Sequence, residues 1–296
     1  MPKRRKWPNV MTKIGFIGAG KVGTALAVQL SNKGYPVVAV ASRTFASAEK
    51  LAEAVPGCKA YENVQRIADN TDLIFITTPD DAILEVVSQI KWHKGNLVVH
   101  CSGAGSLDIL ETAQKTGAQV GAIHPLQSFA SVEQAIKNIP GSTFGIEGDG
   151  PIVDLLEEMA KSLDGKAIQL GAGDKVLYHA AAVMACNYFV TLMQMSTDVW
   201  GKFGVDTNDA IEALGPLLKG TVNNIINAGL PNCLTGPIAR GDAGTIQMHV
   251  DALKAKAPKL LKMYCDLGLE TIPIGIAKGT LDKQKAEEIK NILEDK

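Results

Sequence analysis

Apolar residues over the first 170 positions fall into short runs separated by segments with helical spacing. The runs that we expect to form strands are 14–17, 36–41, 72–78, 96–101, 118–125, 142–147 and 166–170, and helical spacing marks a helix that closes near residue 33 and others at 45–54 and 152–163. Buried strands that alternate with helices are typical of a parallel sheet with right-handed crossovers. The pattern predicts an α/β fold, a doubly wound and mostly parallel sheet, over residues 12–170.

A different pattern begins after Gly171, where the strand signals stop. Periodic segments at 174–203, 207–228, 242–267 and 282–294 predict an all-helical second domain, residues 171–296, for substrate binding and dimerisation. The first of these helices is apolar on too many sides for a surface helix, and such helices are usually buried against others. We therefore expect a homodimer that forms through the helical domain.

Composition and charge narrow the class of protein. The 296 residues are 46% hydrophobic and 21% charged, as in ordinary soluble proteins. A formal net charge of −1 offers no broad positive field to nucleic acid, and no apolar run approaches the length of a membrane span. The basic start of the chain lacks an export signal, so residues 1–11 are expected to be a disordered extension. Five cysteines without C-x-x-C spacing indicate reduced thiols in a cytoplasm, and no spacing indicates a metal site.

The first strand leads into the glycine-rich turn Gly18-Ala-Gly-Lys-Val-Gly23. Gly18 allows a tight turn, Gly20 lets the backbone approach a pyrophosphate, and Gly23 lets the helix pack against the strand. Free N–H groups at the start of the helix then face the phosphates with the positive end of the helix dipole. This Rossmann-type fingerprint predicts dinucleotide contacts from Gly18, Ala19, Gly20, Lys21, Val22 and Gly23.

The end of the second strand indicates which dinucleotide binds. About twenty residues beyond the fingerprint, an NAD enzyme places Asp or Glu on the ribose hydroxyls, whereas this chain has Ser42-Arg43-Thr44. A guanidinium with two hydroxyls can hold a 2′-phosphate. We expect NADP(H) to be preferred over NAD by at least about tenfold, because a charge-assisted hydrogen bond contributes about 1.5–3 kcal/mol.

Two further strand ends are expected to line the nicotinamide side, because ligands of open sheets sit at the carboxyl ends of strands. The residues there are Thr77, Thr78, Pro79, Ser102 and Gly103.

Candidate catalytic residues fall into three clusters. His124 lies at the carboxyl end of the strand 118–125, and an ordinary pKa of about 6.5 suits proton exchange near neutrality. A structural histidine that bonds a backbone carbonyl is equally compatible with that position.

The second cluster is a polar stripe on the apolar helix that begins at 174. Lys175, His179, Val183 and Asn187 follow one another at i+4. Polar groups buried without partners cost about 1–3 kcal/mol each, so they should face a cleft or each other. Asn187 could hold a substrate oxygen or the nicotinamide amide, and Lys175 or His179 could be the acid.

The third cluster is the motif Leu234-Thr-Gly-Pro-Ile-Ala-Arg-Gly-Asp242, which precedes Thr245 and His249 on the following helix. Arg240 suits a substrate carboxylate or a phosphate, and Asp242 suits a helix N-cap. An Arg240–Asp242 pair that only holds the loop is the alternative. The candidate catalytic residues are His124, Lys175, His179, Asn187, Arg240 and Asp242.

Together these motifs resemble those of bacterial NADP oxidoreductases that join a Rossmann-like module to a C-terminal helical domain of unknown function. The resemblance rests on residues 17–23, 42–43, 124–129, 178–179 with 187, and 234–242. That family is similar to ketopantoate reductases, pyrroline-5-carboxylate reductases, and 6-phosphogluconate, hydroxyisobutyrate and prephenate dehydrogenases. These relatives imply a helical domain that often dimerises and an active site between the domains. In the hydroxyacid and ketopantoate relatives a lysine and an asparagine lie one turn apart, whereas Lys175 and Asn187 are three turns apart.

The combined prediction is an NADPH-dependent reductase of a small carboxylate-bearing carbonyl compound, with a ketopantoate-like 2-oxo acid as the leading substrate class. Arg240 would anchor the carboxylate, Asn187 would orient the reacting oxygen, and His124 or His179 would deliver the proton. The alternatives are a prephenate-type dehydrogenase, an imine reductase of the pyrroline-5-carboxylate type, and a non-catalytic NADPH sensor.

Overall fold

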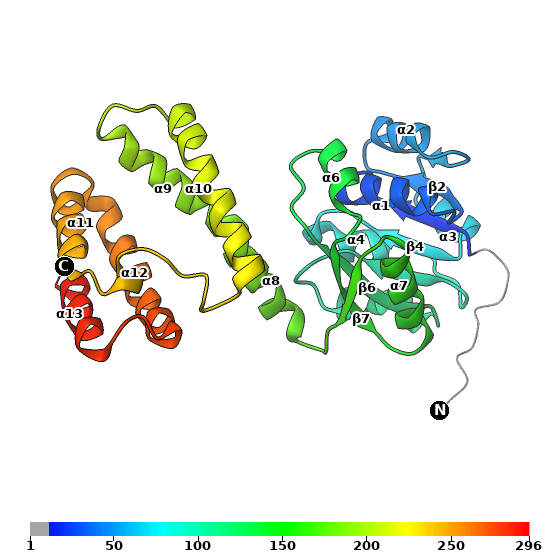
Figure 1. Ribbon diagram of the computed structural model, residues 1–296. Coiled ribbons are helices and arrows are strands. Elements are labelled where there is room, and N and C mark those ends of the chain that lie inside the picture. The colour runs from blue at the N-terminus through cyan, green and yellow to red at the C-terminus, as the bar shows by residue number, and fades with distance from the viewer. Residues whose placement is uncertain (1–11, 296) are drawn as a thin grey trace. The chain divides into compact units, whose positions relative to one another are not determined.

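The computed structural model describes residues Thr12 to Asp295, so the expected extension at 1–11 lies outside the described residues. An eight-stranded sheet, of which Figure 1 labels β2, β4, β6 and β7, has the order β3-β2-β1-β4-β5-β6-β7-β8. The strands are β1 (Ile14–Ile17), β2 (Val37–Ala41), β3 (Lys59–Tyr61), β4 (Leu73–Ile76), β5 (Leu97–His100), β6 (Gln119–Leu126), β7 (Thr143–Gly148) and β8 (Lys166–Gln169). Neighbouring strands are parallel except for the antiparallel pair β6 and β7. The predicted doubly wound, mostly parallel sheet is confirmed, and β3 is a strand that the apolar pattern missed.

Helices cover both faces of this sheet. They are α1 (Lys21–Asn32), α2 (Phe45–Ala54), α3 (Gln65–Asn70), η1 (Asp80–Ala82), α4 (Ile83–Ser88), η2 (Leu107–Leu110), α5 (Glu111–Lys115), α6 (Val132–Asn138) and α7 (Pro151–Ser162). Phe16 and Phe75 stack with centroids 5.0 Å apart in the core under α1 and α7. Ile17 and Ile76, one residue further on, lie in the core under α3 and α4. Burial on two sides explains why these strands are continuous apolar runs.

The order of strands reverses at β1. The chain runs from β1 to β2 and β3 on one side and returns to β4 on the other. Hydrogen bonds bring the strand ends together, because Gly18 N–H donates to Ala41 O at 2.8 Å and Thr77 N–H donates to Ile17 O at 2.8 Å. The carboxyl ends of β1, β2 and β4 therefore form the edge at which doubly wound sheets bind ligands.

The chain divides into two compact units between Cys186 and Asn187. Helix α8 (Asp174–Ala185) belongs to the first unit, although the helical domain was expected to start at residue 171. It packs on the sheet through Lys175, which approaches Glu147 of β7, and Tyr178, which contacts His124 of β6.

The second unit is all-helical, as expected. It contains α9 (Asn187–Gly201), α10 (Thr207–Ala228), η3 (Ile238–Arg240), α11 (Ala243–Lys256), α12 (Pro258–Lys278) and α13 (Lys283–Glu294). The single helix predicted over 242–267 is wrong, because Pro258 has no N–H and pushes Ala257 out of helical geometry, to φ −145° and ψ 54°. The helix predicted over 174–203 is likewise interrupted, at Cys186 (φ −118°, ψ −62°).

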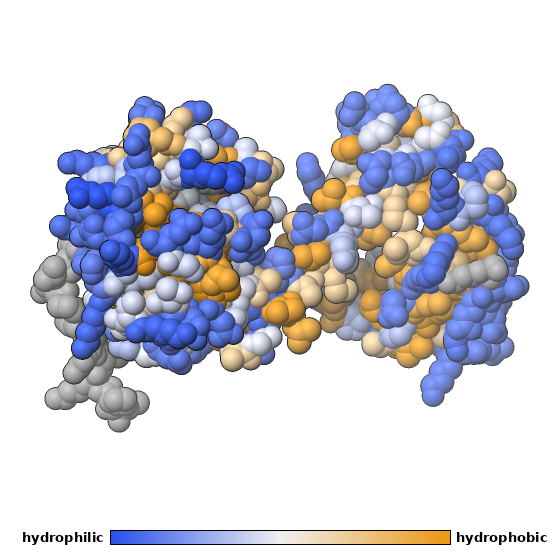
Figure 2. Space-filling model, turned by 180° about the vertical axis from the view of Figure 1, so that it is seen from behind, coloured by the Kyte–Doolittle hydropathy of each residue, from blue (hydrophilic) through white to orange (hydrophobic). Residues whose placement is uncertain are grey.

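The segment Asp174–Gly201, which holds α8 and α9, is long and apolar enough to cross a membrane by length and composition alone. The expectation that no apolar run approaches a membrane span is therefore wrong. Core helices of soluble proteins meet the same criterion. In the single chain the apolar side chains of Asp174–Gly201 are largely exposed, including Leu177 at 75% and Val190 at 67%. Figure 2 shows apolar residues at the surface of the C-terminal helices. The expectation that this helix is buried against others in a dimer stays a prediction.

Candidate functional site

Close contacts shape the glycine-rich turn between β1 and α1. Gly18 has a φ of +109°, and a Cβ on it would lie 2.6 Å from the carbonyl carbon of Thr77. A Cβ on Gly23 would lie 2.4 Å from Thr77 Oγ1 and 2.5 Å from Gly18 O. The Thr77 hydroxyl donates to Gly18 O at 2.7 Å. Only glycine fits at both positions, because the turn packs directly on the end of β4.

Gly20 is glycine for a different reason. A Cβ there would meet no atom within 4 Å, and Gly20 is the N-cap of α1 without any side-chain cap. The first N–H groups of an α-helix have no acceptor within the helix, so here they can bind an external one. Open space beside uncapped N–H groups fits the pyrophosphate of a dinucleotide. Lys21 is exposed at this helix start, whereas Ala19 and Val22 are half-buried.

The residues predicted to select the coenzyme follow β2, beside this turn. Arg43 and Thr44 are exposed and Ser42 is half-buried. Arg43 forms no ion pair with any residue between Thr12 and Asp295. A free guanidinium next to the fingerprint turn is compatible with a phosphate on the adenosine ribose.

The predicted nicotinamide-side residues have distinct local roles. Thr78 Oγ1 is buried and has no hydrogen-bond partner between Thr12 and Asp295, and Pro79 after it is exposed. Ser102 is buried, donates to Asp80 Oδ2 at 2.6 Å and accepts from Gly105 N–H at 2.8 Å. Ser102 therefore joins the loops after β4 and β5. Thr78 is the residue of this group that retains an unused polar atom.

Three rings meet at the carboxyl end of β6. His124 Nδ1 lies 3.0 Å from the Tyr178 hydroxyl, and its ring centroid is 6.0 Å from that of His179. The backbone of Gly103 closes the group, since a Cβ there would lie 2.9 Å from His124 Nε2 and 2.5 Å from His179 Cδ2. Burial and then the nearby His179 and Lys175 charges lower the pKa of His124 to about 4. His124 is therefore neutral at pH 7.

A buried ion pair lies below these rings. Lys175 Nζ is 3.9 Å from Glu147 Oε2, with side-chain exposures of 3% and 9%. Neither atom has a hydrogen-bond partner among the described residues. Burial lowers the pKa of Lys175 to about 8 against the opposing effect of Glu147, and burial raises the pKa of Glu147. Burying the two charges costs desolvation free energy, and their mutual attraction offsets only part of that cost.

His100, at the end of β5, completes the group. It is fully buried, its Nδ1 accepts Ser102 N–H at 3.2 Å, and its Nε2 meets no hydrogen-bond partner of normal geometry among the described residues. Burial, followed by the Lys175 charge, lowers the pKa of His100 to about 3. The structure thus brings together His124, Lys175 and His179 from the sequence prediction.

Sequence analysis missed three members of this cluster as site residues: His100, Glu147 and Tyr178. His100 is the last residue but one of the predicted strand 96–101, so its position near a strand's carboxyl end was a usable signal. Tyr178 precedes His179 and was noted only as part of the resemblance. Glu147 lies at the end of a late strand, and nothing in its neighbourhood in the sequence indicates that Lys175 faces it.

The remaining predicted residues belong to the second unit. Asn187 is exposed at the start of α9. Arg240 Nη2 lies 3.9 Å from Asp242 Oδ2, and the Arg240 side chain is 65% exposed. Asp242 caps α11 by accepting from Thr245 N–H at 3.1 Å and Thr245 Oγ1 at 2.8 Å, and these bonds lower its pKa. The predicted cap is present, and the guanidinium is only loosely paired.

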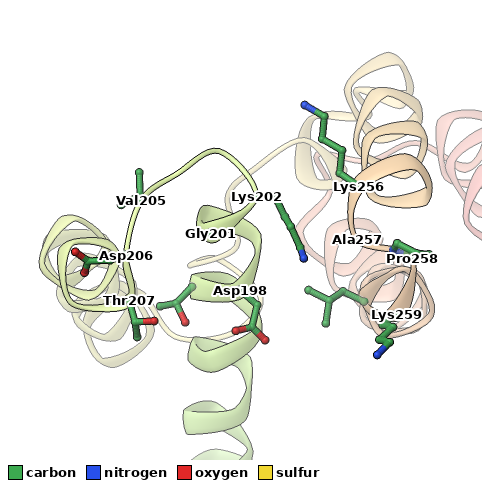
Figure 3. A pocket seen from close by; sticks show the side chains of 12 residues that line it. Asp198, Gly201, Lys202, Val205, Asp206, Thr207, Lys256, Ala257, Pro258 and Lys259 are labelled. Carbon is green, nitrogen blue, oxygen red and sulfur yellow. The ribbon is translucent and has the colours of Figure 1, made fainter.

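Two hollows also lie in this unit. One of about 310 Å³ is lined by Thr235, Pro237 and His249, among others, and His249 Nδ1 lies 2.8 Å from the Tyr264 hydroxyl. One of about 650 Å³ lies between the α9–α10 and α11–α12 turns (Figure 3). Lys256 and Lys259 point away from each other there, so its charges do not converge on one ligand.

Comparison with known families supports the two-part organisation. Residues 5–125 match the family described as a Rossmann-like domain, and residues 142–271 match a domain of unknown function, DUF2520. The chain therefore combines a Rossmann-like N-terminal domain with a DUF2520 domain, as the resemblance implied.

Two characterised relatives are dehydrogenases. The chain is 28% identical over 195 residues to 2-(hydroxymethyl)glutarate dehydrogenase of Eubacterium barkeri, with 59% of this chain and 60% of the relative covered. It is 30% identical over 93 residues to glycerol-3-phosphate dehydrogenase [NAD(P)+] of Clostridium botulinum, with 27% and 28% covered. The chain thus spans less than two thirds of either relative.

Solved structures share the fold over most of the chain. A "putative NADP oxidoreductase" from Bacteroides fragilis has a TM-score of 0.70 at 24% identity, covering 88% of this chain and 98% of that one. A reductive aminase from Aspergillus terreus in complex with NADPH and ethyl levulinate has a TM-score of 0.61 at 18% identity, covering 96% and 93%. A pyrroline-5-carboxylate reductase from Coxiella burnetii has a TM-score of 0.58 at 15% identity, covering 94% and 98%.

Proposed function

We propose that this protein is an NADP(H)-dependent oxidoreductase that reduces a small carboxylate-bearing carbonyl or imine compound, with 2-oxo acids as the leading substrate class. One observation carries the proposal: a single unit holds both an open, uncapped fingerprint turn and a cluster of proton-exchanging groups at neighbouring strand ends. The dehydrogenases among the relatives support this reaction class, and the glutarate in one of their names supports a carboxylate.

Residues of this chain would supply the proton to the substrate. When bound, NADPH supplies a hydride to the substrate carbon. His124 or His179, whose ring centroids lie 6.0 Å apart, would donate the proton to the substrate oxygen or nitrogen. Lys175 has a pKa of about 8 and remains largely charged at pH 7, so its field would stabilise negative charge that develops on the substrate.

Two residues of the second unit would bind the substrate. Arg240 is exposed and only loosely paired with Asp242, which leaves its guanidinium able to form a bidentate contact with a carboxylate. Asn187, exposed at the start of α9, would orient the reacting oxygen. Asp242 would act through the loop by capping α11.

Coenzyme choice is assigned to the loop after β2. Arg43 has no protein partner within the described part of the chain and no carboxylate adjoins it in Ser42-Arg43-Thr44, so NADP(H) would be preferred.

A stepwise assay tests the proposal. Titration with NADPH and with NADH, followed by fluorescence, should show binding with NADPH favoured. NADPH oxidation would then be measured with 2-oxo acids and cyclic imines, and NADP reduction with prephenate. Turnover of prephenate alone would identify a dehydrogenase working in the oxidising direction. Tight NADPH binding with no turnover of any compound would favour a sensor, and the absence of binding would refute the proposal.

A second copy of the chain is the proposed partner of the apolar surface on α8 and α9. Leu177, Met184 and Val190 expose 75%, 67% and 67% of their side chains in the single chain, an apolar surface that monomers seldom leave in water. Sedimentation equilibrium should give a dimer mass. A monomer would refute this, and recruitment to lipid vesicles would indicate that the same surface meets a membrane.

A further inference from the structure

We propose that Glu147 is a positioning residue that holds the Lys175 ammonium in place and keeps it protonated during turnover. This inference rests on the proposed function only for its catalytic consequence. The pairing itself is argued from the geometry of one compact unit.

The register of β6 and β7 places Glu147 on the face that α8 covers. Ala122 lies opposite Glu147, and His124 lies opposite Gly145. Side chains two residues apart on a strand share a face, so Glu147, Gly145 and His124 point the same way. Gly145 leaves room for α8, because a Cβ there would lie 3.0 Å from the Tyr178 hydroxyl. Tyr178 therefore sits over His124 and Gly145, and Lys175, one turn earlier, sits over Glu147.

The two facing atoms of the pair have no hydrogen-bond partner among the described residues. Lys175 Nζ and Glu147 Oε2 are both inaccessible to solvent and neither makes a hydrogen bond. Their separation of 3.9 Å is too long for a direct hydrogen bond but short enough for a strong attraction between the two charges. Glu147 is therefore the main anchor of the Lys175 charge.

Other titratable groups face this pair from each neighbouring element. Those that act on Lys175 are Cys101 after β5 and Asp80 of η1, and Lys175 acts in turn on His100 of β5 and His124 of β6. Asp108 and Asp149 act on Glu147. Cys101 is uncharged at pH 7, because burial raises its pKa to about 12. Asp80 accepts a hydrogen bond from Ser102, and its effect on the Lys175 pKa is smaller than that of Glu147. Glu147 is thus the carboxylate that decides the state of Lys175.

Glu147→Gln tests this assignment, because it removes the charge and keeps the shape. Protein labelled with ¹³C at lysine Cε would be titrated by NMR, with Lys175→Met identifying the Lys175 signal. The apparent pKa of Lys175 should fall by about one pH unit or more, as expected when an opposite charge within about 4–6 Å is lost. Glu147→Asp, which keeps the charge but moves it back by one carbon, should lower the Lys175 pKa by less than Glu147→Gln does. Glu158→Gln, an exposed glutamate on α7, is the matched control and should leave Lys175 unchanged.

An unchanged Lys175 titration in Glu147→Gln overturns the inference. If that variant does not fold, Glu147→Asp decides, because shortening the side chain should still lower the Lys175 pKa measurably. These readouts need no substrate, so they are independent of the proposed reaction. Once a substrate is found, the fall of kcat at high pH should move to lower pH in Glu147→Gln. A uniform loss of rate with an unmoved profile would leave Glu147 a structural residue.

Discussion

Alanine substitutions at two glycines of the fingerprint turn should have different effects: one should lower the stability of the fold, and the other should weaken coenzyme binding. In Gly23→Ala the new methyl group would lie 2.4 Å from Thr77 Oγ1 and 2.5 Å from the Gly18 carbonyl oxygen. The carbonyl is backbone and cannot move aside as a flexible side chain would. Overpacking of this kind costs about 1–3 kcal/mol, whereas alanine in a helix gains up to about 1 kcal/mol over glycine.

The net result for Gly23→Ala is a loss of about 1–2 kcal/mol of folding free energy, because the contact with the carbonyl outweighs the gain in helix propensity. For a unit of this size, that loss should lower Tm by about 2–8 °C.

Gly20→Ala is the matched change three residues earlier. Its methyl group would meet no atom of the described residues within 4 Å beyond its chain neighbours, so only the weaker N-cap preference of alanine counts and the folding free energy should fall by less than about 1 kcal/mol. The same methyl group would occupy the space in which we place the pyrophosphate. NADPH affinity should therefore fall at least about tenfold, which corresponds to about 1.4 kcal/mol.

Thermal unfolding without coenzyme and NADPH fluorescence titration measure the two effects separately. Wild-type NADPH affinity in Gly20→Ala would show that phosphates do not approach this backbone. A Tm of Gly23→Ala equal to that of the wild type would show that α1 does not pack on β4 as closely as described.

The remaining predictions concern charge and assembly. Arg43→Ala should weaken NADPH binding about tenfold or more and leave NADH binding unchanged, as seen by titration with both coenzymes. The pH–rate profile of reduction should fall as pH rises through about 8, where Lys175 loses its proton, and Lys175→Met should abolish that fall. Arg240→Ala should raise KM for a carboxylate substrate by about tenfold or more without changing the NADPH Kd. Leu177→Glu should convert a dimer to monomer by sedimentation, with Glu158→Gln as control.

Seven of the eight strands could be predicted from the sequence because their signals are local. Apolar runs locate the central strands, and α2 has the predicted bounds Phe45–Ala54. Pro258 also gave a local signal that the segment 242–267 is two helices. The prediction missed this signal because helical hydrophobic spacing continues on both sides of the proline. β3 has only three residues with little burial, so it gives no periodic signal.

The chemistry of the cluster was harder to foresee, because it depends on register. His124 and His179 were recognised separately, and only the packing of α8 on β6 brings their rings within 6.0 Å. Glu147 matters because it faces Lys175. That contact depends on the pairing of β7 with β6 and on which side of α8 faces the sheet. A one-residue shift of β7 would turn Glu147 to the opposite face of the sheet.

Stability alone does not account for the buried pair. Replacing a buried ion pair with apolar residues of similar size is often neutral or stabilising by about 1–4 kcal/mol, whereas removing one partner leaves an uncompensated charge and costs about 3–5 kcal/mol. A fold under selection for stability alone would gain from methionine at both Lys175 and Glu147. The pair instead lies beside three rings and two loops that carry the predicted coenzyme contacts, with His100 and His124 both influenced by Lys175. Its physical effect is a positive charge held in a dry environment next to a site of proton exchange, and such a preorganised charge stabilises a developing anion more strongly than solvent does.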